Sequence, residues 1–456
     1  MDSNGKSEQQ RSLVVPDSSG TGVPPQPKVS SIEDSKKNKR ERYLAALGLR
    51  EDPFLLWVAE NEINEQIAKG NYRNPLFYSF FTPVYNQRGV PIPIRYLRQE
   101  RHHIIYGNPG AGKTSLRLWL ELECRLIPNN TLVVTYTPGE GELQPHTEEE
   151  HDRQMAQSFV SDLIIQIIEQ LDSLHYEEMP IAPLAAFITA FPEISRAVEG
   201  MIAEIQQQAD ANKNAVAIEQ HWHRLGRYAV QPVPYSETRA AFLQRLAQAL
   251  KQSSSFEFEK NKERAFTRVL SAASLAHAWG FERVYLLLDG VDNRETKAEE
   301  MFNSLRPLLN AIQAFTKQRI YYKMFLPRQI RRAVDRHLSQ LKNELKNELF
   351  PTISRDTIVW RPNSLKNVIV ERFRAAGAPY ISSLNELADE EIKGELEEAV
   401  IRMANRSPRR LVEIISRLID NHLRNREQPE ENLFFTKQDL VRTQEEMEPK
   451  RRPLNP

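Results

Sequence analysis

Residues 107–114 constrain the fold more than any other part of this sequence. They read GNPGAGKT and fit the pattern G-x-x-x-x-G-K-[ST]. The preceding RHHIIYG (101–107) predicts a short buried strand, and the following SLRLWLELECRL predicts a helix. A glycine-rich turn between a strand and a helix aims backbone N–H groups at an anion, and the positive end of the helix adds to that attraction. The sequence therefore predicts a phosphate-binding loop on an α/β sheet.

The residues of this loop have different expected roles, which follow from the chemistry of their side chains. We expect the ammonium of Lys113 to reach the β- and γ-phosphates of a nucleotide and the hydroxyl of Thr114 to ligate Mg²⁺. The expected ligands are ATP or ADP and Mg²⁺. The residues expected to contact them here are Gly107, Asn108, Pro109, Gly110, Ala111, Gly112, Lys113, Thr114 and Ser115.

A second motif, RVYLLLDGVDN (283–293), supplies carboxylates for the same site. Its apolar run predicts a central parallel strand that is covered on both faces. Asp289 follows at the carboxyl end of that strand, where ligands bind in open α/β sheets, and we expect it to hold Mg²⁺ opposite Thr114. Asp292 is the best available carboxylate to polarise an attacking water. A purely structural turn is the alternative for both aspartates.

Three further apolar runs complete the predicted sheet, at 131–137, 320–327 and 357–362. Because the run at 131–137 lies between the loop and Asp289 in sequence, the layout is that of the additional-strand P-loop ATPases, although sequence order does not prove spatial order. The predicted fold class is α/β, with a five-stranded parallel sheet flanked by helices and connected by right-handed crossovers.

The rest of the chain divides by composition and periodicity. Roughly 145 residues separate the second strand from the acidic strand, far more than one crossover needs. Their amphipathic patterns predict a helical insertion that forms a small core or presents a surface to a partner. The predicted divisions are a disordered tail (1–42), a leading segment (43–100), an ATPase core (101–365) with its insertion (138–265), a helical lid (366–445) and a second tail (446–456).

Composition bounds the setting of the protein. The chain carries 61 basic and 61 acidic residues, so no global field favours nucleic acid or an anionic membrane. Its one cysteine, Cys124, cannot form an internal disulfide, which favours a reducing compartment. No apolar run approaches the roughly 18–20 residues that span a bilayer, and the N-terminus lacks a secretory pattern. We expect a cytoplasmic protein that does not bind membranes.

With these residues assembled, the chain resembles the AAA+/STAND-like branch of P-loop ATPases, including KAP-type proteins. The matching stretches are GNPGAGKT, AWGFERVYLLLDGVD, YYKMFLPRQI and RSPRRLVEIISRLIDNHL. The resemblance implies a helical lid with a basic residue that senses the γ-phosphate, and Arg409 matches it, with Arg410 close behind. It also implies a homo-oligomer or a protein partner, with an arginine finger at Arg328, Arg331 or Arg332. A solvated basic helix is the alternative for these arginines.

Two departures from that family bear on catalysis. Many relatives carry a glutamate at or shortly after the position following the strand aspartate, where this chain has Gly290 and Asn293, and its fourth strand ends in apolar residues without a polar sensor. We therefore expect a regulatory ATPase that hydrolyses ATP slowly and whose nucleotide state controls conformation or assembly. The alternatives are a non-hydrolysing scaffold that holds ATP, and a DNA-associated ATPase of initiator or transposition-helper type, which the basic runs 36–42 and 328–336 favour. Hydrolysis would depend on Lys113, Asp289, Asp292 and Arg409.

Overall fold

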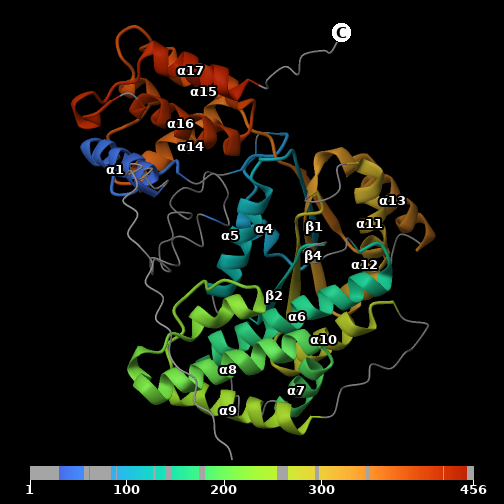
Figure 1. The fold of residues 1–456 in the computed structure, drawn as a ribbon. Helices are drawn as coiled ribbons and strands as arrows, with labels where there is room; N and C mark the ends of the chain where they lie inside the picture. Colours follow the sequence, from blue (N-terminus) through green and yellow to red (C-terminus); the bar gives the residue numbers. More distant parts are fainter. Residues whose placement is uncertain are drawn as a thin grey trace, which may run out of the picture.

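A parallel β-sheet forms the centre of the chain (Figure 1). The computed structural model describes residues 30–55, 61, 84–88, 90–126, 130–138, 145–173, 180–253, 265–292, 297–345, 350–424 and 426–448. Its five strands lie in the order β2-β3-β4-β1-β5, and every neighbouring pair is parallel. The strands are β1 (His102–Gly107), β2 (Thr131–Tyr136), β3 (Arg283–Leu288), β4 (Ile320–Pro327) and β5 (Ile353–Thr357). The predicted α/β class and five-stranded parallel sheet are confirmed.

The fifth strand is the one that sequence placed wrongly. It was predicted at 357–362, but β5 begins at Ile353 and reads ISRDT. Because β5 pairs only with β1, it is an edge strand, and most of its residues are only half-buried. The apolar residues Ile358 and Trp360 are buried beyond the end of the strand instead. An edge strand needs fewer apolar side chains than a central one, so the apolar run marked the wrong residues.

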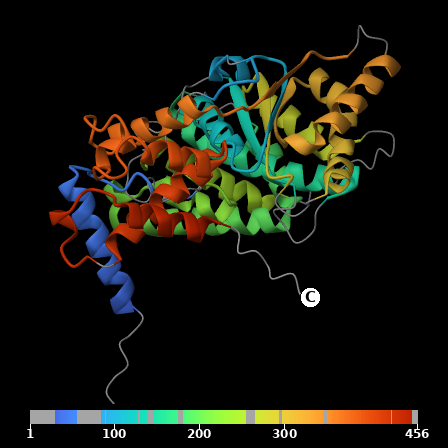
Figure 2. The same cartoon turned by 90° about the horizontal axis from the view of Figure 1, so that it is seen from above.

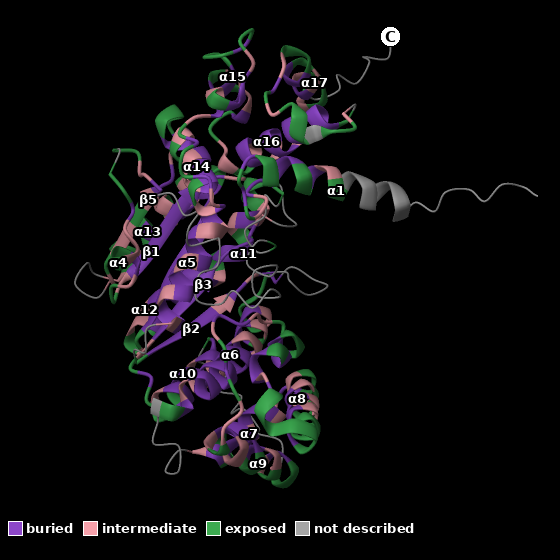
Figure 3. Cartoon of the chain, turned by 90° about the vertical axis from the view of Figure 1, so that its left-hand side faces the viewer, coloured by how far each residue is buried: buried purple, intermediate pink, exposed green. Residues whose placement is uncertain are grey.

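Helices cover both faces of the sheet, and alternation along each strand sends side chains to two separate cores. In β3, Leu286 and Leu288 join the core on one face, whereas Tyr285 and Leu287 join the core on the other. Helix α5 (Lys113–Leu126) packs on the second face. Figure 3 shows the strands as a buried layer between helices. This two-sided burial explains why β3 reads as a continuous apolar run.

The described helices precede, connect and follow the strands along the chain. No helix in the described part of the chain is long and apolar enough to cross a membrane. Beside α5, the helices are α1 (Ser30–Ala46), α4 (Ile94–Leu97), α6 (Glu148–Gln170), α7 (Ile181–Thr189), α8 (Pro192–Asn212), α9 (Glu237–Gln252), α10 (Thr267–Ala278), α11 (Ala298–Asn310), α12 (Ile312–Lys317), α13 (Arg331–Glu344), α14 (Pro362–Ala375), α15 (Leu396–Ala404), α16 (Pro408–Leu423) and α17 (Lys437–Met447).

The segment between β2 and β3 is helical, and it closes the free edge of β2. The side chain of Gln166 accepts from the N–H of Val133 (3.0 Å) and donates to its carbonyl (2.6 Å). Asp162 accepts from the N–H of Thr135 (2.9 Å), and Arg227 donates to the carbonyl of the same residue (3.1 Å). These side chains take the place of a sixth strand and satisfy backbone groups that would otherwise offer a pairing edge.

The apolar residues of this helical segment do not form a separate core. Ile164 of α6, the buried Trp222 and Leu246 of α9 belong to the same hydrophobic cluster as Leu286 of β3. Of the two readings that the sequence left open, burial in a core therefore accounts for these residues. That core is continuous with the sheet, so the insertion and the sheet form one packed unit.

The N-terminal tail predicted for residues 1–42 is helical from Ser30 onward, so that boundary was wrong. Helix α1 packs against the C-terminal helices, and Figures 1 and 2 show them side by side. The guanidinium of Arg40 forms ion pairs with Asp52 and with Asp420 (2.6 Å), and the hydroxyl of Tyr43 donates to Leu433 O (3.0 Å). Composition did not predict this helix, because two of these partners, Asp420 and Leu433, lie 380 and 390 positions away in sequence. Residues 1–29 and 449–456 lie outside the described residues.

Three buried histidines make the stability of the fold depend on pH. Burial lowers the pKa of His102 and His103 to about 3 and that of His151 to about 4. In the unfolded chain these three histidines take up protons below about pH 6.5, whereas in the folded chain they remain neutral until a lower pH. Folding stability should be complete above pH 6.5 and fall toward pH 4, by up to about 1.4 kcal/mol per pH unit for each histidine. Urea unfolding at pH 7.5, 6.0 and 5.0 measures this slope.

The variant His103→Asn isolates one of the three contributions. It should reduce the pH slope of the unfolding free energy by about a third, because one of three similar proton uptakes is removed. His223 is exposed, so His223→Asn is the matched control and should leave the slope unchanged. A slope that is equal in wild type and His103→Asn would contradict the assignment.

Candidate functional site

The turn between β1 and α5 is held from two directions. Gly107 ends β1, Lys113 begins α5, and Gly110 between them has a φ of 71°. The indole N–H of Trp360 donates to Ala111 O (2.8 Å) from the segment that follows β5. On the other side, Ser407 Oγ donates to Gly110 O (3.3 Å). The loop is therefore fixed by contacts with distant parts of the chain and not only by its own sequence.

The functional groups of the first turn of α5 meet the end of β3. Thr114 Oγ1 donates to Asp289 Oδ2 (2.7 Å). Lys113 Nζ donates to Gly107 O (3.3 Å) and lies 3.4 Å from Asp292 Oδ2. Strand β4 lies between β1 and β3, and the carboxyl ends of all three strands point the same way. The structure thus brings together the lysine, the hydroxyl and the two carboxylates that the sequence singled out.

The oxygen atoms at this edge suit a magnesium ion. Mg²⁺ favours oxygen ligands and commonly takes only one or two from the protein, with waters and phosphates completing its octahedron. Thr114 Oγ1 and the carboxylate of Asp289 are two such atoms. In the described residues, no group of three or more His, Cys, Asp or Glu side chains could hold a metal ion by itself. The donor set therefore fits Mg²⁺ that arrives with a phosphate ligand.

The residue after Asp289 has a backbone conformation that disfavours a glutamate at this position. Gly290 has a φ of 74°, a left-handed conformation that side chains with a Cβ rarely adopt. Its N–H donates to Asp289 Oδ1 (2.9 Å). The turn thus orients the Asp289 carboxylate, and the backbone conformation that it requires disfavours a glutamate at position 290. Asn293 lies outside the described residues.

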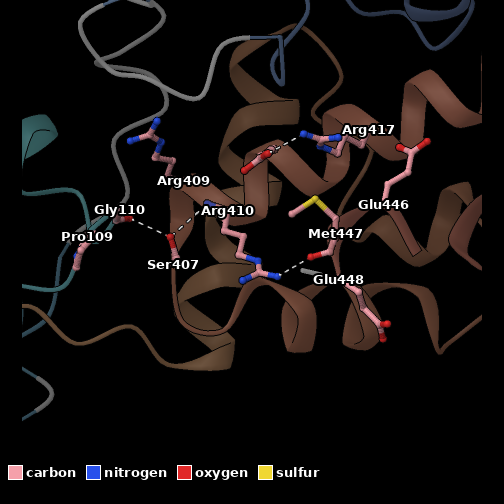
Figure 4. Close-up of a pocket in the computed structure, with 10 residues that line it drawn as sticks. Pro109, Gly110, Ser407, Arg409, Arg410, Arg417, Glu446, Met447 and Glu448 are labelled. Atoms are coloured by element: carbon pink, nitrogen blue, oxygen red, sulfur yellow. Dashed lines mark hydrogen bonds and ion pairs between the residues drawn. The ribbon is translucent and has the colours of Figure 1, made fainter. Parts of the chain in front are cut away.

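The C-terminal helices contact the loop through the N-terminus of α16, beside an open cleft of about 460 Å³ (Figure 4). Ser407 caps α16 by accepting from the N–H of Arg410 (3.2 Å). The guanidinium of Arg410 turns away and donates to Met447 O (3.2 Å). Arg409 is exposed, and its side chain lies along Gly110, where an added Cβ would lie 3.2 Å from Arg409 Cβ. Of the two arginines, Arg409 is therefore the better placed to reach a ligand at the loop between β1 and α5.

The three candidates for an arginine finger differ in their surroundings. Arg331 donates to Thr357 Oγ1 (2.9 Å) and pairs with Asp335 (3.4 Å), so it joins α13 to β5 within the chain. Arg328 and Arg332 are exposed. An internal structural role accounts for Arg331. Arg328 and Arg332 remain predicted candidates for an arginine finger.

Sequence reasoning missed three residues that shape this site. One is Trp360, which lies beyond the end of β5. Another is Ser407, whose signal was a serine directly before a helix that starts with proline, a pattern typical of capping. The third is Arg117, whose Nε lies 3.4 Å from Asp289 Oδ2. Its signal was its position one helical turn after Lys113, on the same face of the predicted helix.

The contact between the loop and α16 can be tested with one glycine. A Cβ on Gly110 would lie 2.6 Å from Ser407 Oγ, whereas a Cβ on Gly112, whose φ is 85°, would meet nothing within 4 Å. Both alanine variants carry the conformational cost of a left-handed residue, but Gly110→Ala adds an overlap. We expect it to lower the unfolding free energy by about 1–3 kcal/mol more than Gly112→Ala, measured by urea unfolding.

Adding Ser407→Ala to Gly110→Ala should recover part of that extra cost, because the overlapping Oγ is removed. The capping hydrogen bond is lost as well, which costs about 1 kcal/mol in the single variant. The two effects should therefore be less than additive. Equal costs for the two glycine variants, or strict additivity with Ser407→Ala, would show that α16 does not rest on the loop.

Comparisons with known proteins leave the chain without an assigned family. No family model, no curated protein and no solved structure matches it. Its function therefore has to be argued from its own residues and their geometry.

Proposed function

We propose that this chain is an ATP-binding regulatory protein of the AAA+/STAND-like type that hydrolyses ATP slowly, and whose nucleotide state controls its conformation or assembly. One observation carries the proposal. Lys113 and Thr114, from a glycine-rich turn, lie against Asp292 and Asp289, from the end of another strand, at 3.4 and 2.7 Å. A phosphate chain with Mg²⁺ needs a cation, backbone N–H groups and hard oxygen ligands in this proximity.

The sheet order supports the same proposal. A strand, β4, separates the strand that precedes the loop from the strand that ends in Asp289. This is the arrangement expected of the additional-strand class, and the sequence could suggest it only through the order of its motifs. The carboxyl edge of an open parallel sheet is also the place where such proteins bind ligands.

The nucleotide would act through the helical unit that contains α14 to α17 and α1. A γ-phosphate can interact with Lys113, with Mg²⁺ and with Arg409 at once, whereas ADP cannot. A ligand shifts a conformational equilibrium only by its difference in affinity for the two states, and this third contact supplies such a difference. Attack of water on the γ-phosphate, with Asp292 as the general base, would return the unit to its ADP state.

A non-hydrolysing ATP-binding scaffold is the second candidate, and two observations favour it. Gly290 occupies the position of the missing glutamate in a left-handed conformation, and Asp292 forms an ion pair with Lys113. A carboxylate whose oxygen is engaged by an ammonium is less available to hold a water for attack. The two candidates share the nucleotide site and differ only in phosphate release.

Binding to DNA gains no support from the basic run at 36–42. Arg40 pairs with Asp52 and Asp420, and Arg42 pairs with Glu430. These guanidinium groups neutralise carboxylates within the protein and are not arranged as a phosphate-binding surface.

Lys113→Ala tests nucleotide binding directly. Bound ATP should stabilise wild type by about 2.7 kcal/mol at a concentration of one hundred times Kd, which raises the midpoint of thermal unfolding. Removal of the ammonium should abolish most of this shift, because Lys113 is the only lysine in residues 107–115. Lys317→Ala is the matched control, since Lys317 is an exposed lysine at the amino end of β4. An ATP-induced shift that persists in Lys113→Ala would refute the site.

The two arginines of α16 make a second matched pair. Arg409→Ala should weaken ATP binding about tenfold or more and leave ADP binding nearly unchanged, because a charged hydrogen bond to the γ-phosphate is lost. Arg410→Ala should leave the ratio of ATP to ADP affinity unchanged, since its guanidinium is engaged with Met447 O. Calorimetric titration with both nucleotides measures the ratio. A reversed pattern would assign the sensing role to Arg410.

A further inference from the structure

A row of charged residues runs along a buried face of α5. Lys113, Arg117, Glu121 and Arg125 are spaced four apart, so they share one face of the helix. All four are buried, with exposed fractions of 2–6 %. Charged side chains are rarely buried unless they are paired. The row therefore has to be explained by its partners.

The partners connect the row into a chain that leads away from the candidate site. Arg117 Nε lies 3.4 Å from Asp289 Oδ2, and its Nη1 lies 3.2 Å from Glu121 Oε2. Glu121 Oε1 lies 3.0 Å from Arg125 Nη1, and Arg125 Nη2 lies 2.6 Å from Glu169 Oε1. Glu169 belongs to α6. Charges of alternating sign thus link the end of β3 to the helical segment between β2 and β3.

The centre of this chain is ionised and well bonded. Burial opposes ionisation of Glu121, but Arg125 and Arg117 outweigh it and hold the pKa of this carboxyl below its ordinary value. Glu121 also accepts from the hydroxyls of Tyr228 (2.5 Å) and Thr135 (3.3 Å). Buried charges with such partners are costly to break, so each member responds to the removal of its neighbour.

We propose that Arg117 is a positioning residue for Asp289, and that the chain through Glu121 and Arg125 to α6 sets how strongly Arg117 holds this carboxylate. The inference rests on the proposed function in one respect, since it assigns Asp289 to the metal of a bound nucleotide. Glu121 and Asp289 both interact with the guanidinium of Arg117. Whatever strengthens its interaction with Glu121 weakens its interaction with Asp289, and a less neutralised Asp289 binds Mg²⁺ more tightly.

The consequence is a coupling between the site and the helical segment. Any event that moves α6 relative to α5 changes the attraction between Glu169 and Arg125, and the change passes along the chain to Asp289. By linkage, a metal ion at Asp289 must in turn bias the position of α6. The helical segment would then respond to Mg²⁺ and nucleotide without touching either.

Two substitutions at the far end of the chain give effects of opposite sign. Arg125→Gln removes one of the two arginines that pair with Glu121. The remaining one, Arg117, is drawn toward Glu121 and away from Asp289, so Mg²⁺ should bind more tightly. Glu169→Gln leaves Arg125 with Glu121 alone, which frees Arg117 for Asp289, so Mg²⁺ should bind more weakly. The readout is the affinity for ATP with Mg²⁺ divided by the affinity in EDTA, and we expect changes of about threefold or more.

The opposite signs separate positioning from a purely structural role. General loosening of the protein would lower the ratio in both variants, and that result, or an unchanged ratio in both, would overturn the proposal. Arg239→Gln is the matched control, because Arg239 is a buried arginine that pairs with Asp172 (2.8 Å) near the end of α6 but takes no part in the chain. Its ratio should equal that of wild type.

A second variant guards against failure of Arg125→Gln to fold. The double substitution Arg125→Met with Glu169→Leu replaces the buried ion pair by apolar side chains, a change that proteins often tolerate. It also leaves Glu121 with Arg117 alone, so the Mg²⁺ ratio should rise as in Arg125→Gln. A fall would contradict the proposal.

A measurement without nucleotide distinguishes failure of this inference from failure of the proposed function. Asp289→Asn and Arg125→Gln can be combined in a double-mutant cycle of urea unfolding. With Asp289 neutral, Arg117 turns to Glu121 and compensates for the lost arginine, so the combined shift of the midpoint should be smaller than the sum. Additive shifts would overturn the chain even if ATP binds. Less than additive shifts in a protein that does not bind ATP would retain the chain and reject the function.

Discussion

The hydrogen bond between Thr114 and Asp289 joins the two halves of the candidate site. Thr114 belongs to the first turn of the helix after β1, and Asp289 follows β3, from which β1 is separated by β4. Because the sheet is parallel, the carboxyl ends of β1 and β3 lie at one edge, and this brings the two residues together. Lys113, Asp292 and Arg117 take their positions from the same two elements. The N–H of the left-handed Gly290 donates to Asp289, and Thr114 and Arg117 contact the same carboxylate. The proposed chemistry depends on that junction.

The surroundings of the junction connect it to both helical parts of the protein. On one side, Ser407 reaches the carbonyl of Gly110 and places Arg409 along the loop. Helix α16, which begins after Ser407, also contacts α1, because Arg40 of α1 donates to Ser416 O of α16. On the other side, buried charges lead from Arg117 to α6. A change at the loop between β1 and α5 therefore has two physical routes into the rest of the chain, and neither requires a long-range field.

Sequence reasoning succeeded where the signal is local. The strand, turn and helix around residues 107–115 are contiguous, and the strand before Asp289 is apolar on both faces, so these elements could be predicted from a short window. It failed where the cause lies far away in sequence. Residues 30–42 look unable to bury a core, yet Arg40 finds Asp52 and Asp420. The stripe of Arg117, Glu121 and Arg125 would pass for a solvated face, and only the fold shows that α6 and Tyr228 cover it.

The central claim is that a nucleotide with Mg²⁺ binds at the junction of β1, α5 and β3. Equilibrium dialysis of the wild-type chain against labelled ATP, with Mg²⁺ and then with EDTA, tests it most directly. The proposal predicts one nucleotide per chain, bound more tightly with Mg²⁺ because Thr114 and Asp289 would supply two of its ligands. Absence of saturable binding at millimolar ATP, or equal affinity with and without Mg²⁺, would contradict the account.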